Sequence, residues 1–338
     1  MKRLAGMYAR IAELPLEIAE YRLERLEAPV TRDLLRVTTL VRLAGRGEEG
    51  LGEDVTWYAE AHDREQAAGP TRPLGGAWVL ESFSSALGIE EPHKRWAYES
   101  AALDLALRQA GRSLADALGR TRRAVTFVVS PGLGDPPSAD ALKRRLVLYP
   151  ELRFKLDPSS EWTDELVHEL AATGTVDIVD YKAFYSDPDS APPDVALYRR
   201  VAEGFPEAWL EDPALTEETD EALRPHRDRI TWDAPIHSVA DVERLPFGPR
   251  TLNVKPSRFG FVRELLEFYD YCEDRGIGLY GGGMFELGAG RGQVQQLASL
   301  FHPDAPNDVA PGGYNEREPR AGLPTSPLRA PADEPGFR

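Results

Sequence analysis

The sequence predicts an α/β protein, a (β/α)7-8 barrel of the TIM type with an N-terminal α+β capping domain. Two observations predict the fold: short apolar runs alternate with helical segments over the second half of the chain, and strands followed by helices precede them. Such alternation indicates βα units and a parallel sheet. Eight units in roughly 200 residues fit a closed barrel better than an open sheet. A third observation is that ionisable residues recur where the apolar runs end.

The N-terminal part of the chain has the pattern of a separate α+β unit. Residues 37–57 alternate between apolar and polar, as strands do, and the glycine-rich segment 45–52 predicts the turn between them. Residues 99–119 carry apolar side chains at helical spacing. Within them we expect a break at Gly111 and a helix C-cap at Gly119. Strands and helices in this order are typical of an α+β domain.

The barrel strands are predicted from apolar runs that follow this unit. These runs are 124–130, 152–157, 176–180, 208–212, 229–234, 251–257 and 276–282, with 307–313 as an eighth. We therefore place the capping domain at 1–123 and the barrel at 124–315. The proline-rich tail, 316–338, is expected to pack back onto the capping domain.

Composition narrows the class of protein. Of the 338 residues, 42% are hydrophobic and 28% charged, which is globular composition. No apolar stretch approaches the roughly 20 residues that span a bilayer, and the start does not resemble a secretory signal. Cys272 is the single cysteine, so no intramolecular disulfide can form. We expect a cytoplasmic protein, and its net charge of −16 argues against a nucleic-acid partner.

Carboxylates end three consecutive predicted strands: Asp180, Glu211 and Asp233. Because the C-terminal ends of barrel strands build the active site, we expect the three to converge. Close carboxylates repel unless a cation lies between them, and oxygen ligands suit a hard ion such as Mg²⁺. A strand-end Asp can also be a helix N-cap, but three acids in a row favour a metal site.

Two lysines flank this group of acids. Lys155 lies on the strand before the first acid, and Lys255 on the strand after the last. A lysine at a buried strand end is costly unless it is paired or has a lowered pKa. Two such lysines could take and give a proton on opposite faces of a carboxylate substrate, while the metal stabilises the enolate.

The order Lys, Asp, Glu, Asp, Lys on strands two to six resembles the enolase superfamily, specifically its muconate-lactonising branch, and Lys bases beside Mg²⁺ are a known pattern of that superfamily. GEEGLGED resembles the turn of the family's capping domain, and WLEDP and ITWDAPIHS resemble two metal-ligand strands. NVKPSRFG and GGMFELGAGRGQ are similar to segments of the N-acylamino acid racemase/o-succinylbenzoate synthase group.

The resemblance implies roles for particular residues. The three strand-end carboxylates would bind Mg²⁺, or alternatively Mn²⁺, and Lys255 would be the acid/base of strand six. Three further residues would lie near the substrate: Ser257, Arg258 and Glu286. The turn GAGRGQ also offers backbone N–H groups to an anion, such as a substrate carboxylate.

The sequence departs from the family pattern at two strands. The family's strand-two motif is Lys-x-Lys with the second lysine as base, and here the segment is RFKLD. Counting back from Asp180 favours Lys155 as the base, whereas aligning on Trp162 places Asp157 at the base position, beside the substrate. Strand three usually carries Asp-x-Asn and here carries DYK, so Lys182 shares a face with Asp180. Lys182 is therefore a second candidate base, or a counter-ion of a site acid.

Together these features predict an Mg-dependent isomerase or lyase that removes a proton α to the carboxylate of a small substrate. The outcome would be racemisation or epimerisation, cycloisomerisation, or syn-dehydration. An acid-sugar dehydratase is one alternative, although the run GIGLYGGGM lacks the histidine of the His-base branch. A non-catalytic enolase-like binding protein with an altered base motif is another. We expect a homo-oligomer with neither nucleic-acid nor membrane partners.

Overall fold

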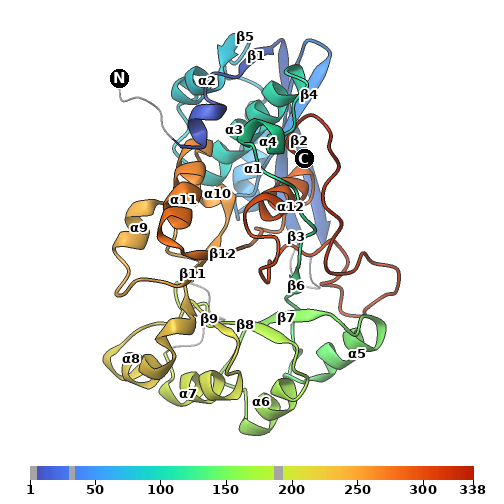
Figure 1. Cartoon of the computed structure of the whole chain (residues 1–338). Helices are drawn as coiled ribbons and strands as arrows, with labels where there is room; N and C mark the ends of the chain where they lie inside the picture. Colours follow the sequence, from blue (N-terminus) through green and yellow to red (C-terminus); the bar gives the residue numbers. More distant parts are fainter. Residues whose placement is uncertain (1–5, 30–34, 186–192) are drawn as a thin grey trace.

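The computed structural model describes residues 6–29, 35–185 and 193–338, and the structural statements below refer to these ranges. Figure 1 shows the N-terminal elements at the top, above the barrel strands, with α5 to α8 along the lower edge. None of the helices in the described ranges combines the length and the hydropathy needed to cross a bilayer.

The N-terminal unit contains two antiparallel sheets. One has the order β2-β3-β4, and in the other β1 pairs with β5. The strands are β1 (Pro15–Ile18), β2 (Glu20–Pro29), β3 (Leu35–Gly45), β4 (Glu48–Asp54) and β5 (Gly76–Val79). The helices are η1 (Tyr8–Arg10), α1 (Ala59–Ala68), α2 (Leu80–Ala86), α3 (Pro92–Gln109) and α4 (Leu114–Leu118).

The β3–β4 turn is shorter than the predicted segment 45–52. It consists of Arg46 and Gly47, both with positive φ, and the later glycines lie inside β4. A Cβ atom on Gly50 would lie 2.2 Å from the carbonyl oxygen of Ala101 in α3. Gly50 therefore allows α3 to pack closely against β4, which is a role that glycine can have within a strand as well as in a turn. The predicted extent of the turn was wrong for this reason.

The helical segment that follows divides as predicted. α3 ends at Gln109 and Gly111 has φ 62°. α4 ends at Leu118, and its C-cap, Gly119, adopts the left-handed conformation with φ 64°. Glycine takes this conformation without a steric penalty, so the break and the C-cap are both confirmed.

Parallel strands form the second part of the chain. Five of them follow the order β10-β9-β8-β7-β6, and β11 pairs with β12. Their bounds are β6 (Val128–Val129), β7 (Arg153–Leu156), β8 (Val176–Asp180), β9 (Trp209–Glu211), β10 (Ile230–Thr231), β11 (Thr251–Val254) and β12 (Gly278–Gly281).

Backbone hydrogen bonds close these strands into a barrel. The closing N–H donors and carbonyl acceptors are Asn253 to Trp232 (3.0 Å), Asp308 to Gly281 (2.8 Å) and Val128 to Asn307 (2.8 Å). Residues 307–308 thus form a short eighth strand between β12 and β6. The predicted TIM-type barrel with an N-terminal α+β unit is confirmed.

Helices connect the strands outside the barrel. They are α5 (Asp140–Leu148), α6 (Asp164–Ala171), α7 (Val195–Gly204), α8 (Glu217–Leu223), η2 (Arg224–Arg229), α9 (Val239–Glu243), α10 (Pro256–Phe259), α11 (Val262–Arg275) and α12 (Ala289–Phe301). The tail contacts both parts of the chain, since Leu328 bridges to Val125 beside β6 and the Phe337 N–H donates to Asp104 of α3. The division of the chain at residues 123 and 124 stays a prediction.

Candidate active site

The C-terminal ends of β7 to β11 bring the predicted acids and lysines into one buried cluster. Asp180 and Glu211 are the last residues of β8 and β9, Asp233 follows β10, and Lys255 follows β11 directly. This is the end of a parallel barrel at which active sites form.

Lys155 of β7 lies between two of the acids. Its Nζ atom is 3.0 Å from Asp180 Oδ2 and 2.6 Å from Glu211 Oε1, and its side chain is 4% exposed. Burial acts to lower the pKa of Lys155, but the two carboxylates outweigh burial and raise that pKa well above its ordinary value. The side chain is therefore an internal ammonium that compensates the charge of both acids.

Glu211 accepts hydrogen bonds on both of its oxygens. Tyr280 donates its hydroxyl to Oε2 at 2.7 Å, and Asn253 donates its amide to Oε1 at 3.2 Å. Burial, together with the neighbouring acids, raises the pKa of Glu211 well above its usual range against the effect of Lys155. The sequence analysis missed Tyr280 and Asn253. Asn253 could have been predicted, because it lies two residues before Lys255 and therefore points to the same face of the strand.

Asp233 is held by cations on both oxygens. Lys255 Nζ lies 2.8 Å from Oδ2 and Arg258 donates to Oδ1 at 2.6 Å, while the hydroxyl of Tyr185 donates to Oδ2 at 3.0 Å. Burial alone would raise the pKa of Asp233, but Arg258 and Lys255 lower it below its usual range. Arg258 thus binds an acid of the cluster, whereas we had placed it near the substrate. Tyr185 gave no signal in the sequence.

A group of carboxylates with the spacing of metal ligands is present, and one of its members was not predicted. One oxygen from each of Asp180, Glu211 and Asp212 lies within 4.8 Å of the others. Both oxygens of Asp212 accept backbone N–H groups, from Asp233 and Ala234, each at 2.8 Å. Burial and nearby acids raise the pKa of Asp212 to about 7.

Asp212 escaped prediction because adjacent residues of a strand point to opposite faces, so a carboxylate directly after Glu211 should point away. Its φ of 50° turns the chain and brings its side chain back to the cluster. The predicted ligand set with Asp233 as its third member stays a prediction.

The donor chemistry fits a hard divalent cation. Four buried carboxylates, those of Asp180, Glu211, Asp212 and Asp233, are gathered here, and three side-chain cations contact them: Lys155, Lys255 and Arg258. Carboxylate oxygens are the ligands that Mg²⁺ and Mn²⁺ prefer. The acidic triad is therefore suited to metal binding, with the internal cations supplying part of the charge compensation.

A second ion pair joins the extensions of β7 and β8. Lys182 Nζ lies 2.5 Å from Asp157 Oδ2, and their side chains are 44% and 40% exposed. The backbone N–H of Lys182 donates to Asp180 Oδ1 at 2.9 Å, and Lys182 has φ 52°. Lys182 is thus paired with Asp157, and no described contact joins its ammonium to a carboxylate of the metal group.

The N-terminal unit contacts the loops at this end of the barrel. His93 of α3 shares a 2.9 Å hydrogen bond with the hydroxyl of Ser257, and the buried Arg36 of β3 donates to the carbonyl oxygen of Met284 at 3.1 Å. Ser257, which we had placed near substrate, therefore has its hydroxyl at this contact.

The remaining predicted residue, Glu286, is bound within its own loop. It accepts the Met284 N–H at 2.6 Å and lies 3.1 Å from Arg291. Directly after it, Glu53 of β4 accepts the N–H groups of Leu287, Gly288 and Gly290 at 2.6 to 3.0 Å. The N-terminus of α12 is therefore filled by an acid of the chain, and the expectation that a substrate anion binds there was wrong.

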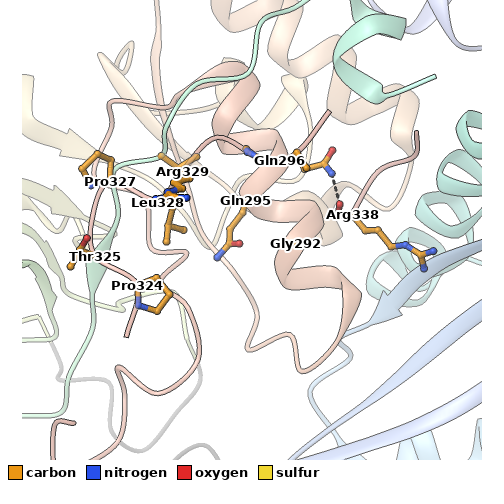
Figure 2. Close-up of a pocket in the computed structure, with 12 residues that line it drawn as sticks. Gly292, Gln295, Gln296, Pro324, Thr325, Pro327, Leu328, Arg329 and Arg338 are labelled. Atoms are coloured by element: carbon orange, nitrogen blue, oxygen red, sulfur yellow. Dashed lines mark hydrogen bonds between the residues drawn. The ribbon is translucent and has the colours of Figure 1, made fainter. Parts of the chain in front are cut away.

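A cavity of about 580 Å³ lies away from the strand ends, between α12 and the tail. Figure 2 shows Gln295 and Gln296 of α12 facing tail residues such as Leu328, with Gln296 donating to the carbonyl oxygen of Arg338 at 2.5 Å. None of the predicted site residues lines this cavity. It therefore adds nothing to the strand-end chemistry.

Solved structures share the fold. The dipeptide epimerase of Methylococcus capsulatus, complexed with Mg and the dipeptide L-Arg-D-Lys, superposes with a TM-score of 0.73 at 20% identity, covering 95% of this chain and 99% of that one. The muconate lactonizing enzyme of Pseudomonas fluorescens, complexed with muconolactone, gives 0.67 at 21% identity, with 87% and 88% covered. At these identities the likeness establishes the fold alone.

Curated relatives are enzymes. The N-succinylamino acid racemase of Thermus thermophilus is 29% identical over 332 residues, which is 91% of this chain and 86% of the relative. The o-succinylbenzoate synthase of Bacillus subtilis is 30% identical over 223 residues, or 63% of this chain and 57% of the relative.

The barrel fold is shared with a solved member of the enolase superfamily, the curated relatives are a racemase and a synthase, and the strand-end carboxylates have the spacing of metal ligands. Two family models divide the chain between them. The C-terminal domain of DUF8230, a domain of unknown function, matches residues 121–316, and its N-terminal domain matches residues 9–117. The chain belongs to the DUF8230 family.

Proposed function

We propose that this chain is a divalent-cation-dependent enzyme that moves the proton α to the carboxylate of a small substrate. The observation that supports the proposal best is the position of the lysines. Lys155 on β7 and Lys255, directly after β11, each contact the acidic cluster. In the closed order of eight strands, β7 and β11 lie four strands apart, on opposite sides of the barrel. A substrate held over the acids would present one face to each side.

Asp180, Glu211 and Asp233 would hold Mg²⁺, or Mn²⁺ as an alternative. A cation bound there would supply positive charge to the substrate carboxylate, so that the negative charge left by α-proton removal is stabilised. The residues of the chain do the proton transfer. A lysine on one side takes the α-proton, and Lys255 serves the face on its own side. Tyr185 and Arg258 hold Asp233 in place while the proton moves.

The relatives suggest the substrate class. Because a racemase of N-succinylamino acids aligns over most of both chains, we propose an N-acylated amino acid or a compound of similar shape. We favour racemisation over cycloisomerisation and syn-dehydration. Racemisation needs only removal of a proton from one face of the α-carbon and return of a proton to the other face.

Deuterium exchange tests this function. The purified protein, stripped with EDTA and reloaded with Mg²⁺, is incubated in D₂O with N-succinyl-L-phenylalanine, N-succinyl-L-arginine and L-alanyl-L-phenylalanine. We expect the α-proton signal of at least one probe to disappear from the proton NMR spectrum, and EDTA to stop its loss. Glu211→Gln, which removes one acid of the cluster, should be inactive. Exchange with no probe, or exchange that EDTA leaves unchanged, would refute the proposed function.

A further inference from the structure

Glu53, an acid of the N-terminal unit, holds the loop between β12 and α12. It lies on β4 with 1% exposure, and its carboxylate accepts four hydrogen bonds. One donor is the hydroxyl of Thr38 on β3, at 2.8 Å. The other three are backbone N–H groups at the end of the loop and the start of α12, those of Leu287, Gly288 and Gly290. The backbone of the loop is therefore fastened to the N-terminal unit by a buried acid.

Two further contacts join the same loop to the same unit. The buried Arg36 donates to the carbonyl oxygen of Met284 at 3.1 Å. The ring centroids of Trp57 and Phe285 lie 6.2 Å apart. Phe285 has φ 57°, a left-handed conformation that a bulky residue keeps only where its surroundings impose it. The N-terminal unit thus supplies part of the constraint that fixes the loop.

The loop begins at the acidic cluster of the barrel. Tyr280, on the strand that leads into it, donates to Glu211 at 2.7 Å. Two residues further on, a Cβ atom on Gly282 would lie 2.8 Å from Cε of Lys255 and 2.9 Å from Oδ1 of Asn253. The backbone of the loop therefore packs directly against side chains of the site, and a displaced loop would change the shape of the barrel mouth.

We propose that Glu53 is a positioning residue, which holds residues 284–290 at the barrel mouth so that the N-terminal unit takes part in substrate binding through this loop. The inference rests on the proposed function and adds a role for the N-terminal unit. Within the described ranges, no hydrogen bond or ion pair joins Glu53 to the four carboxylates of the cluster. Loss of Glu53 should therefore weaken the binding of substrate and leave the binding of Mg²⁺ unchanged.

Hydrogen–deuterium exchange tests the position of the loop without any substrate. The wild type and Glu53→Gln are compared by mass spectrometry of a peptide that covers residues 284–292. Glutamine replaces an acceptor oxygen with an NH₂ group, which cannot accept from a backbone N–H. Because hydrogen bonds to a charged acceptor are lost, exchange in this peptide should become about tenfold faster or more.

Two references show whether the effect is local. Glu48→Gln changes an exposed acid at the start of the same strand and should match the wild type. The N–H of Val262, at the start of α11, donates to Glu99 of α3 at 2.9 Å. The peptide that contains Val262 should exchange at the wild-type rate in Glu53→Gln, because this second contact between the N-terminal unit and the barrel is intact.

Kinetics test the consequence for substrate. The probe is whichever of the three compounds named above the Mg²⁺-loaded wild type exchanges fastest. In Glu53→Gln, KM for this probe should rise about tenfold while kcat stays within about threefold, the pattern of lost binding rather than lost chemistry. The affinity for Mg²⁺ in calorimetric titration should equal that of the wild type. Glu53→Asp, which keeps the charge, should recover part of the KM.

Gly290→Ala disturbs the same contact from the barrel side, and it decides the matter if Glu53→Gln does not fold. A Cβ atom on Gly290 would lie 3.0 Å from Oε2 of Glu53 and 2.8 Å from Cγ of Glu286, so the carboxylate must shift. Faster loop exchange and a raised KM are again expected. Gly248→Ala is the matched control, because a Cβ atom there would meet nothing within 4 Å.

Each outcome counts for or against the proposal. Loop exchange and KM equal to those of the wild type in the folded variants would overturn it. A lowered affinity for Mg²⁺ or a lowered kcat with KM unchanged would overturn it as well, because Glu53 would then support the metal group. A wild type that exchanges none of the probes refutes the proposed function and the role in substrate binding with it, whereas faster loop exchange in Glu53→Gln would still show that Glu53 holds the loop.

Discussion

The Nζ atom of Lys155 lies 2.6 Å from Glu211 Oε1, at the buried end of two neighbouring strands. The same ammonium reaches Asp180 at 3.0 Å. Lys155 thus compensates part of the negative charge of the two carboxylates. In a cluster of acids without such a lysine, a bound metal ion would have to do so. Two consequences follow: the barrel should fold without metal, and the bound metal should be repelled by this lysine.

Replacing Lys155 with methionine should make the fold depend on the metal. Removing one partner of a buried ion pair leaves uncompensated charge and costs about 3–5 kcal/mol. In EDTA, the free energy of unfolding of Lys155→Met should therefore fall by that amount in urea denaturation. The affinity for Mg²⁺ should rise about tenfold or more in calorimetric titration, because a positive charge beside the ligands is gone.

Lys143→Met provides the comparison for this variant, since its pair with Glu169 is exposed and worth at most about 1 kcal/mol. It should change neither quantity appreciably. An Mg²⁺ affinity that falls in Lys155→Met would show that the lysine supports the metal site rather than opposing the cation.

Asp233 and Asp212 compete for the place of third ligand, and we expect Asp233 to be the ligand. Its oxygens are held by the flexible side chains of Lys255 and Arg258, which can move aside. The oxygens of Asp212 are fixed by two backbone N–H groups of the following turn. Asp233→Asn should therefore weaken Mg²⁺ binding at least thirtyfold. Asp212→Asn should instead lower stability by about 1–2 kcal/mol, because buried hydrogen bonds are lost.

Calorimetric Mg²⁺ titration and urea unfolding of the two variants, made side by side, decide between the ligand sets. If Asp212→Asn abolishes binding and Asp233→Asn does not, the ligands are Asp180, Glu211 and Asp212.

The strands and their terminal residues could be predicted because the information is local. The run 176–180 coincides with β8, and the acids at its end and at the end of β9 lie where the short apolar run of a parallel strand stops. The eighth strand, 307–308, could also be placed, because one short apolar run remained to close the barrel. The lysines of β7 and after β11 were found in the same way.

Contacts between distant parts of the chain could not be predicted. The filling of the α12 N-terminus by Glu53 joins residues more than 200 positions apart, and no local pattern records it. Asp212 was hidden by its left-handed backbone, which reverses the direction that strand alternation predicts. Packing at the strand ends also decides which of two nearby lysines, Lys155 or Lys182, pairs with Glu211. In the structure it is Lys155.

The two buried histidines, His302 and His93, should contribute less to stability as the pH falls below about 6, whereas Asp212, whose pKa is raised to about 7, acts in the opposite direction. Burial lowers the pKa of His302 to about 4, below the ordinary value of 6.5, and His93 is shifted in the same way. The unfolded chain then binds more protons than the folded one between these values. The stabilisation is therefore present above pH 6.5 and is lost toward pH 4. For each histidine we expect a loss of roughly 1 kcal/mol for each pH unit between about 6 and 4.

Urea unfolding at pH 7, 6, 5 and 4 measures this dependence. His302 joins α12 to the eighth strand through Asn307 at 2.6 Å, so His302→Gln should be less stable at pH 7 but show a shallower slope. His168→Gln, at an exposed position on α6, should retain the wild-type slope. A His302→Gln slope equal to that of wild type would show that this histidine does not titrate in the window.

The central claim is that Lys255 transfers a proton to or from the α-carbon of a carboxylate substrate. It is tested most directly by the rate of α-proton exchange of N-succinyl-phenylalanine in D₂O, compared between Mg²⁺-loaded wild type and Lys255→Met. The account predicts that the variant binds Mg²⁺ but no longer interconverts the enantiomers, with the exchange of one of them reduced at least a hundredfold. Full exchange and inversion of both enantiomers by Lys255→Met would contradict it.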